Sequence, residues 1–289
     1  MSSTLAFTLI PILIDVIAVL GLYLLANTGR LSVGHAAFFG VGAYTSAVLS
    51  TKLGMPPFIS IGVGTVAAWL TGLLFAAIAD RLTHWFFAIT TLAFSVMMVG
   101  LVSSIDYLGG ATGLYGVPLA VEFPHALAAV CLTLAVVIWV DHSRFGRAMR
   151  AVRDSEFAAQ ALGIHPARIR ILAFGLGTLI AGFAGALYVH YLGLVKPADM
   201  SLERSLMYLV YLSIGGMEFW GGAILGTVLL GALPEVLRFS KEYRLAMFGA
   251  LLTLVMLIRP AGLLSRPPRL ARLLRRKRGQ PVAPELHAK

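Results

Sequence analysis

The chain alternates between long apolar runs and short polar interruptions. A helix needs about 20 predominantly apolar residues to cross a bilayer, and several of the apolar runs reach that length. Spans are predicted at residues 5–26, 58–79, 85–104, 125–140, 171–192, 205–217, 222–237 and 245–258. With residues 32–50 as a further candidate, the pattern predicts an all-α, polytopic transmembrane helical bundle of about eight to ten spans, with about nine preferred.

Residues 32–50, SVGHAAFFGVGAYTSAVLS, are apolar but rich in small side chains. Ala36 and Gly40 are four residues apart, a spacing that lets helices approach closely in lipid. The segment could be a complete span, a re-entrant segment or a broken helix. His35 is its one ionisable group. A hydrogen-bonded structural role is the more common one for such a histidine, and contact with a transported molecule is the alternative.

Composition supports the membrane assignment and charge orients the chain. Hydrophobic residues make up 58% of the sequence and charged residues only 12%, about half the charged share of soluble domains. The net charge of +10 is concentrated in residues 143–170 and in the segment from Arg259 onward. Basic loops stay on the cytoplasmic side, so we expect the N-terminus outside and the C-terminus inside. This distribution favours contact with anionic lipid headgroups over nucleic acid.

The polar interruption at residues 143–170 contains a short predicted helix. Asp154 or Ser155 can act as its N-cap, and Glu156 follows where the helix dipole favours an anion. Gly163 suits the C′ position, and Pro166 cannot continue the helix. The helix would be roughly 12 Å long. Two interpretations remain: a basic loop that only sets topology, or a docking element for a soluble partner.

The pattern of the loop resembles a known family. Glu156, Ala158, Ala159 and Gly163 are similar to the Glu-Ala-Ala coupling motif of ABC importer permeases, here with Phe157 inserted after the glutamate. The wider stretch GRAMRAVRDSEFAAQALGI resembles the branched-chain amino acid permease family, M-type subunit. The supporting stretches are LSVGHAAFFGVGAYTSAVL, ITTLAF, GGATGLYGVP, AFGLGTLIAGFAGALY and GALLTLVMLIRPAGLL.

The resemblance implies the transmembrane subunit of an ABC importer that moves branched-chain or related amino acids. It also implies a second, homologous permease, two ABC ATPase subunits, an extracytoplasmic binding protein, and a place in the bacterial inner membrane. ATP and Mg would bind the ATPase partners, and no cofactor is expected in this chain. A urea or short-chain amide permease shares the pattern. An ion-coupled secondary transporter is the alternative of another class, with Asp15 as its candidate coupling group. Asp15 could lie inside the first span or near its extracellular end, and the sequence leaves both positions open.

Three sets of functional residues are predicted. The ATPase-coupling set is Gly146, Arg147, Arg150, Arg153, Asp154, Glu156, Phe157, Ala158, Ala159, Leu162 and Gly163. The translocation path or gate is expected to include His35, Gly40, Gly42, Tyr44, Thr91, Thr112 and Gly113. Helix packing is assigned to Gly177, Ala181, Gly185, Gly222 and Gly226, because small residues four apart form close-packing faces.

The remaining features bound the domain and exclude enzymatic classes. The sequence contains no HExxH, GxSxG, paired-cysteine metal spacing or Walker motif, so a non-catalytic transport subunit is expected. The glycine-rich residues 105–124 are interpreted as a flexible external gate or docking surface. Cys131 lies in an apolar run and is expected to be a buried small hydrophobe. Residues 1–264 would form the permease domain, and 265–289 a basic cytoplasmic tail.

Overall fold

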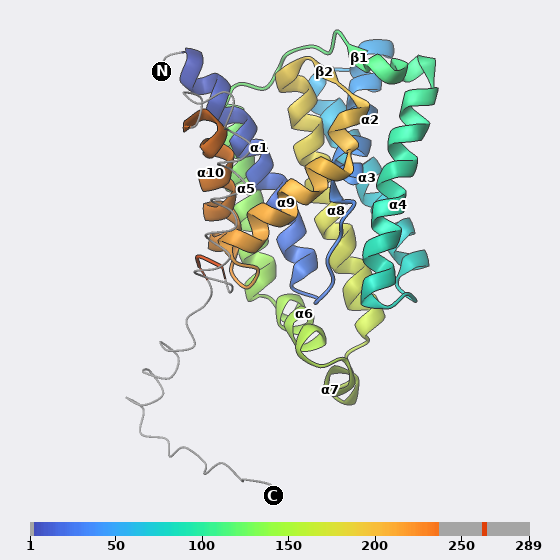
Figure 1. Cartoon of the computed structure of the whole chain (residues 1–289), viewed down its shortest axis with the longest axis vertical. Helices are drawn as coiled ribbons and strands as arrows, with labels where there is room; N and C mark the ends of the chain where they lie inside the picture. Colours follow the sequence, from blue (N-terminus) through green and yellow to red (C-terminus); the bar gives the residue numbers. More distant parts are fainter. Residues whose placement is uncertain (1–2, 237–261, 265–289) are drawn as a thin grey trace, which may run out of the picture.

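A computed structural model describes residues 3–236 and 262–264 as a bundle of helices (Figure 1). The helices are α1 Ser3–Ala26, α2 His35–Lys52, α3 Pro57–Ala79, α4 His84–Ser104, α5 Phe123–His142, α6 Arg144–Asp154, α7 Glu156–Ala161, α8 Pro166–Leu192, α9 Leu202–Gly215 and α10 Trp220–Val236. The predicted helical, polytopic fold is confirmed. The predicted span at 245–258 and the tail at 265–289 lie outside the described residues.

Five of the described helices are long and apolar enough to cross a membrane. The apolar segments are Leu9–Ala26 in α1, Pro57–Ala79 in α3, Trp85–Ser104 in α4, Phe123–His142 in α5 and Pro166–Leu192 in α8. The expected limits of these spans therefore agree with the structure to within a few residues. The described part of the chain holds fewer complete spans than the nine expected, because four candidate segments take other forms or lie outside it.

The predicted spans 205–217 and 222–237 are two halves of one bent pair. The pair comprises α9 and the α10 residues Trp220–Leu233, bent by 118° at a short break. Together the halves are long enough to count as one span, which raises the possible number in the described residues to six. Gly222 makes the bend tight, because a Cβ there would lie 2.5 Å from the Gly215 carbonyl oxygen. Gly226 likewise lies against the backbone of α9. The prediction of two separate spans is wrong for this region.

The segment 32–50 forms a buried helix that starts inside the bundle. α2 follows a non-helical stretch, and it is not among the helices apolar enough to span alone. At its first residue, His35 Nε2 lies 3.1 Å from the carbonyl oxygen of Ala18, near the middle of α1. The Ala36 amide donates to Ser205 Oγ at 3.0 Å. The stretch between α1 and α2 is not helical, and such backbone is tolerated inside a membrane only where protein or a water-filled cavity surrounds it. Residues 35–52 themselves form one continuous helix.

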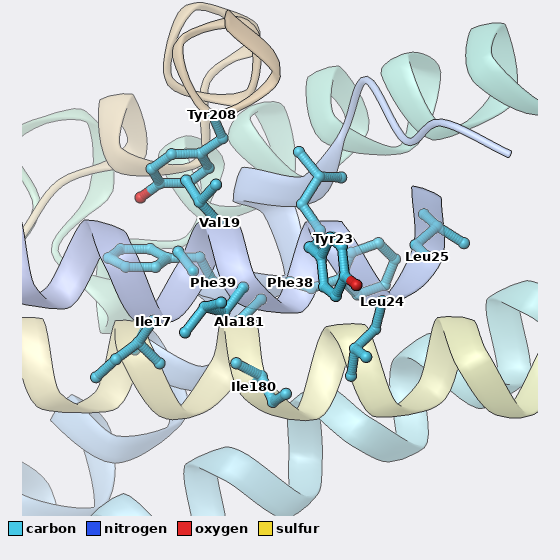
Figure 2. Packing of buried hydrophobic residues seen from close by; sticks show 14 of the residues in the cluster. Ile17, Val19, Tyr23, Leu24, Leu25, Phe38, Phe39, Ile180, Ala181 and Tyr208 are labelled. Atoms are coloured by element: carbon cyan, nitrogen blue, oxygen red, sulfur yellow. The ribbon is translucent and has the colours of Figure 1, made fainter. Parts of the chain in front are cut away.

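The packing centre is α8, which contacts α1, α2 and α3 (Figure 1). Gly177 and Gly21 face each other so closely that a Cβ on either would come within 2.7 Å of the other's carbonyl oxygen. Gly185 meets the Phe39 carbonyl oxygen in the same way. Figure 2 shows Ala181 of α8 near Phe39 within this fully buried core.

The outer faces of α3, α4 and α5 carry exposed large apolar side chains. Leu74, Ile78, Trp85 and Trp139 are examples, and lipid can cover such surfaces. Cys131 lies on α5 and is exposed. The prediction that this cysteine is buried is wrong, because an apolar run marks lipid contact as readily as a protein core.

The two ends of the bundle differ in structure. At one end lie α6, α7 and the C-terminal end of α1, and at the other lie the N-terminal end of α1, β1 (Leu114–Tyr115) and β2 (Leu194–Val195) (Figure 1). The strands pair antiparallel, with Leu114 opposite Val195. Positive φ values at Gly109, Gly110, Gly113 and Gly116 shape the glycine-rich loop before and after β1. We take the end that carries the arginine-rich α6 as cytoplasmic.

Candidate functional site

Helix α6 is anchored under the end of α5. The Ser143 hydroxyl caps it by accepting from the amides of Phe145 and Gly146 at 3.1 and 3.2 Å. Gly146 lies against the carbonyl oxygens of α5, with no room for a side chain. Arg150 forms an ion pair with the buried Asp141. These contacts fix the direction in which the chain leaves the membrane.

Helix α7 is a separate short element with a cap at each end. The N-cap is Ser155, one of the two candidates from sequence, whose Oγ accepts from the Ala158 amide at 3.3 Å. Asp154 is the last residue of α6. Leu162 is the C-cap, one residue beyond the helix, and Gly163 follows with φ of 77°. Glycine adopts that conformation without strain, so the chain can reverse toward α8.

The short helix presents apolar side chains to solvent. Phe157 is 86% exposed and Leu162 is 78% exposed. Ala158 is also exposed, whereas Ala159 is buried against the rest of the chain. Two large apolar side chains on a small capped helix outside the membrane form a surface suited to a protein partner.

An ion-pair chain ties α7 to the transmembrane helices. Glu156 Oε1 lies 2.9 Å from Arg170 Nη1 on α8. Arg170 also binds both carboxylate oxygens of Asp80, the C-cap of α3, at 2.7 and 2.9 Å. Arg30, in the loop after α1, reaches the same carboxylate at 3.2 Å. Bidentate pairs of this kind are among the stronger and more directional polar contacts. The chain therefore links α7 to α8, α3 and the loop after α1.

Burial in this network affects the pKa of Arg30, which lies in the loop after α1. Desolvation lowers the pKa of Arg30, and the nearby charge of Arg170 adds to that effect, whereas Asp80 and Glu156 oppose it. A guanidinium stays protonated in proteins. Arg30 therefore remains a cation that depends on Asp80.

Two other arginines of the coupling set make local contacts. Arg147 Nη1 donates to the carbonyl oxygen of His142 at 3.0 Å. Arg153 lies beside Gly29, with its Cγ 3.3 Å from where a Cβ would stand, and pairs with exposed Asp154 at 3.2 Å. The loop after α1 therefore also touches α6.

The residues predicted for a translocation path lie at several places. His35 is buried beside Ala18, and Gly42 lies against the α8 backbone at Gly182. Gly40 lies against the Met200 side chain. The role of these residues in transport stays a prediction.

The other predicted path residues lie on α2, α4 and the external loop. Tyr44 lines an apolar pocket of about 320 Å³ between α2 and α4. Thr91 accepts from the Val33 amide at 3.0 Å. Thr112 donates to the Gly109 carbonyl oxygen at 2.9 Å, and Gly113 lies against Val195. The residues lining the Tyr44 pocket include no charged group.

Sequence reasoning missed a second charged cluster, in the outer half of the bundle. Arg204 of α9 pairs with Asp199 at 2.7 Å and with Asp15 of α1 at 3.6 Å. The Tyr208 hydroxyl donates to Asp15 at 3.2 Å and accepts from Arg204 Nε at 2.8 Å. Asp15 was singled out from sequence as a charge inside a span. Its partner Arg204 could not be identified from sequence, because it follows almost two hundred residues later.

The sequence has relatives among known transport proteins. The sequence model of the family described as "Branched-chain amino acid transport system / permease component" matches residues 4–258. The high-affinity branched-chain amino acid transport system permease protein LivM of Escherichia coli is 30% identical over 288 residues, covering 87% of this chain and 68% of LivM. The corresponding permease protein LivH is 28% identical over 270 residues, covering 83% and 87%. A probable LivM of Methanocaldococcus jannaschii is 22% identical over 272 residues, covering 80% and 79%.

No solved structure gives a significant match. The fold, with its apolar spanning helices and a capped helix outside the membrane, is that of a multi-pass membrane permease. The chain belongs to the family of permease components of branched-chain amino acid transport systems.

Proposed function

We propose that the chain is the M-type permease subunit of an ATP-driven importer for branched-chain amino acids in the bacterial inner membrane. Its relatives are named as permease proteins of such transport systems. Two kinds of permease, LivM and LivH, both resemble this chain, which supports pairing with a second, homologous permease. Two ATPase subunits that bind ATP and Mg, and an external binding protein, complete the proposed importer.

The observation that carries the coupling role is the exposed apolar surface of α7. Phe157 and Leu162 would enter a groove on an ATPase subunit, where their burial favours association. When the ATPase subunits close, they would push on α7. Its pair with Arg170 would carry that displacement to the ends of α8 and α3.

Two other transport mechanisms make different demands on the chain. A urea permease would keep the same coupling helix but carry a neutral substrate. An ion-coupled transporter needs an intramembrane acid free to bind a proton or cation. Asp15 is the candidate acid, but ion coupling would leave the exposed apolar side chains of α7 without a function. The exposed surface of α7 therefore supports an ATP-driven mechanism over an ion-coupled one.

Reconstitution of the complete importer tests this proposal. The chain is purified with its cognate permease, ATPases and binding protein and placed in proteoliposomes. We expect leucine uptake that requires ATP and the binding protein and that persists when ion gradients are collapsed. Urea in place of leucine tests the substrate. Uptake that follows an ion gradient without ATP would contradict the mechanism, and ATP-driven uptake of urea alone would contradict the substrate class.

A further inference from the structure

The cluster of Asp15, Asp199 and Arg204 is charged, lies at membrane depth and is open on one side. Asp15 is about 9 Å along α1 from Leu9, where the apolar span begins. The side chains of Asp15, Arg204 and Asp199 are 23%, 18% and 15% exposed. Charged side chains within a membrane face the bundle interior or a water-filled cavity, because lipid cannot solvate them. The open side of this cluster therefore faces water or a polar partner surface.

The backbone around the cluster is also of a kind that lipid does not tolerate. Asp199 belongs to the 3₁₀ turn Pro197–Met200, and α9 starts only at Leu202. His35 lies 6.5 Å from the Tyr208 ring, and its Nδ1 has no hydrogen-bond partner among the described residues. Non-helical backbone at membrane depth is typical of binding sites in transporters.

The arginine is held in place by aromatic rings. The Arg204 guanidinium lies 4.1 Å from the ring centroid of Phe39 and 4.4 Å from that of Tyr188. Figure 2 shows Phe39 of α2 below Tyr208 of α9. Stacking of this kind fixes the plane of the guanidinium while leaving its N–H edge available. The two rings therefore hold the Arg204 guanidinium in a fixed orientation.

The contact between the acid and the base is loose. Arg204 and Asp15 are 3.6 Å apart, whereas Arg170 and Asp80 at the cytoplasmic end are 2.7 Å apart. A carboxylate offers about four acceptor positions and a guanidinium five donors. The contacts described here leave some positions of each group unused. A small ligand could engage both groups without first removing every existing contact.

We propose that Asp15 and Arg204 form a transient contact for the zwitterionic head group of an amino acid on its way through the membrane. Asp15 takes the ammonium group and Arg204 the carboxylate. This inference rests on the proposed function and locates a contact for the charged groups of its substrate. A neutral amide such as urea offers neither charge.

Cysteine accessibility tests whether the open side faces water. Asp15→Cys is made in a Cys131→Ser background and assembled into the full importer. A membrane-impermeant thiol reagent should modify the introduced cysteine at least tenfold faster than it modifies Cys131 in the wild-type importer, where Cys131 lies exposed on the apolar α5. Leucine-loaded binding protein with ATP should slow the reaction. A rate equal to that of Cys131 in every state would overturn the proposal.

Uptake measurements test recognition and do not depend on the cysteine variant. In Asp15→Asn and Arg204→Lys importers, leucine uptake should fall at least tenfold more than ATP hydrolysis stimulated by the loaded binding protein. Asp15→Glu should recover part of the uptake. A purely structural pair would lower assembly, uptake and hydrolysis together, and that result would overturn the proposal. If the wild-type importer shows no ATP-driven leucine uptake, the proposed function itself has failed.

Discussion

Small side chains set the distances between the central helices of this protein. Gly21 and Gly177 bring α1 and α8 into backbone contact, and Gly185 does the same for α8 and α2. In lipid the hydrophobic effect does not drive helices together, so such close packing is a main source of association. These glycines therefore determine where the large side chains of the core can lie.

The residue between those two contacts provides a direct test. Ala181 is fully buried on α8. Ala181→Leu adds three carbon atoms where the helices already touch, and overpacking of this kind costs about 1–3 kcal/mol. We expect a lower yield of folded protein in detergent and a lower melting temperature, with Leu172→Ala on the exposed part of α8 as the control. Unchanged yield and melting temperature would show that this face does not pack as described.

Ion pairs at the cytoplasmic end connect elements that are far apart in sequence. Asp80 ends α3 and is shared by Arg30 and Arg170, while Arg170 also holds Glu156 of α7. Removing one partner of a buried ion pair is costly because it leaves a charge without compensation. Asp80 therefore orients the arginine that holds α7.

Asp80→Asn should accordingly destabilise the protein. It leaves two buried guanidinium groups close together, at a cost of about 3–5 kcal/mol. The measurement is thermal unfolding of the purified protein, which should shift down by several degrees. Asp154→Asn is the matched control, because its pair with Arg153 is exposed and exposed pairs contribute little. Equal melting temperatures for both variants would contradict a structural role of the network.

At the scale of the whole molecule, the sequence predicts those parts of the fold that depend only on residues close together in the chain. The limits of α1, α3, α4, α5 and α8 follow from long apolar runs that end at polar residues. The position of α2 could not be predicted in this way. Its sequence is rich in Gly, Ala and Ser and is compatible with several depths in the membrane, and its surroundings are mostly other helices. The bend between α9 and α10 depends on contacts between two helices. Within the site, the N-cap Ser155 and the glycine after the C-cap, Gly163, could be predicted from local sequence. The ion-pair chain from Glu156 to Arg30 could not, because it joins residues more than a hundred positions apart.

Topology is a property of the whole molecule and can be measured directly. Gln160 on α7 and Ala198 before α9 are both exposed and lie at opposite ends of the bundle. In a Cys131→Ser background, we expect an impermeant reagent outside the cell to label Ala198→Cys but not Gln160→Cys. Permeabilised cells should label both. Labelling of both positions from outside in intact cells would contradict the assigned orientation.

The central claim is that α7 couples this permease to an ATPase through its exposed apolar side chains. Its most direct test is the ATP hydrolysis of the purified importer when loaded binding protein is added. The double variant Phe157→Ala, Leu162→Ala should insert at normal levels but retain less of the ATPase subunits on purification, and its stimulated hydrolysis should fall at least tenfold. Gln160→Ala, an exposed polar position on the same helix, should behave as wild type. Full co-purification and full stimulation in the double variant would show that α7 is not the coupling element.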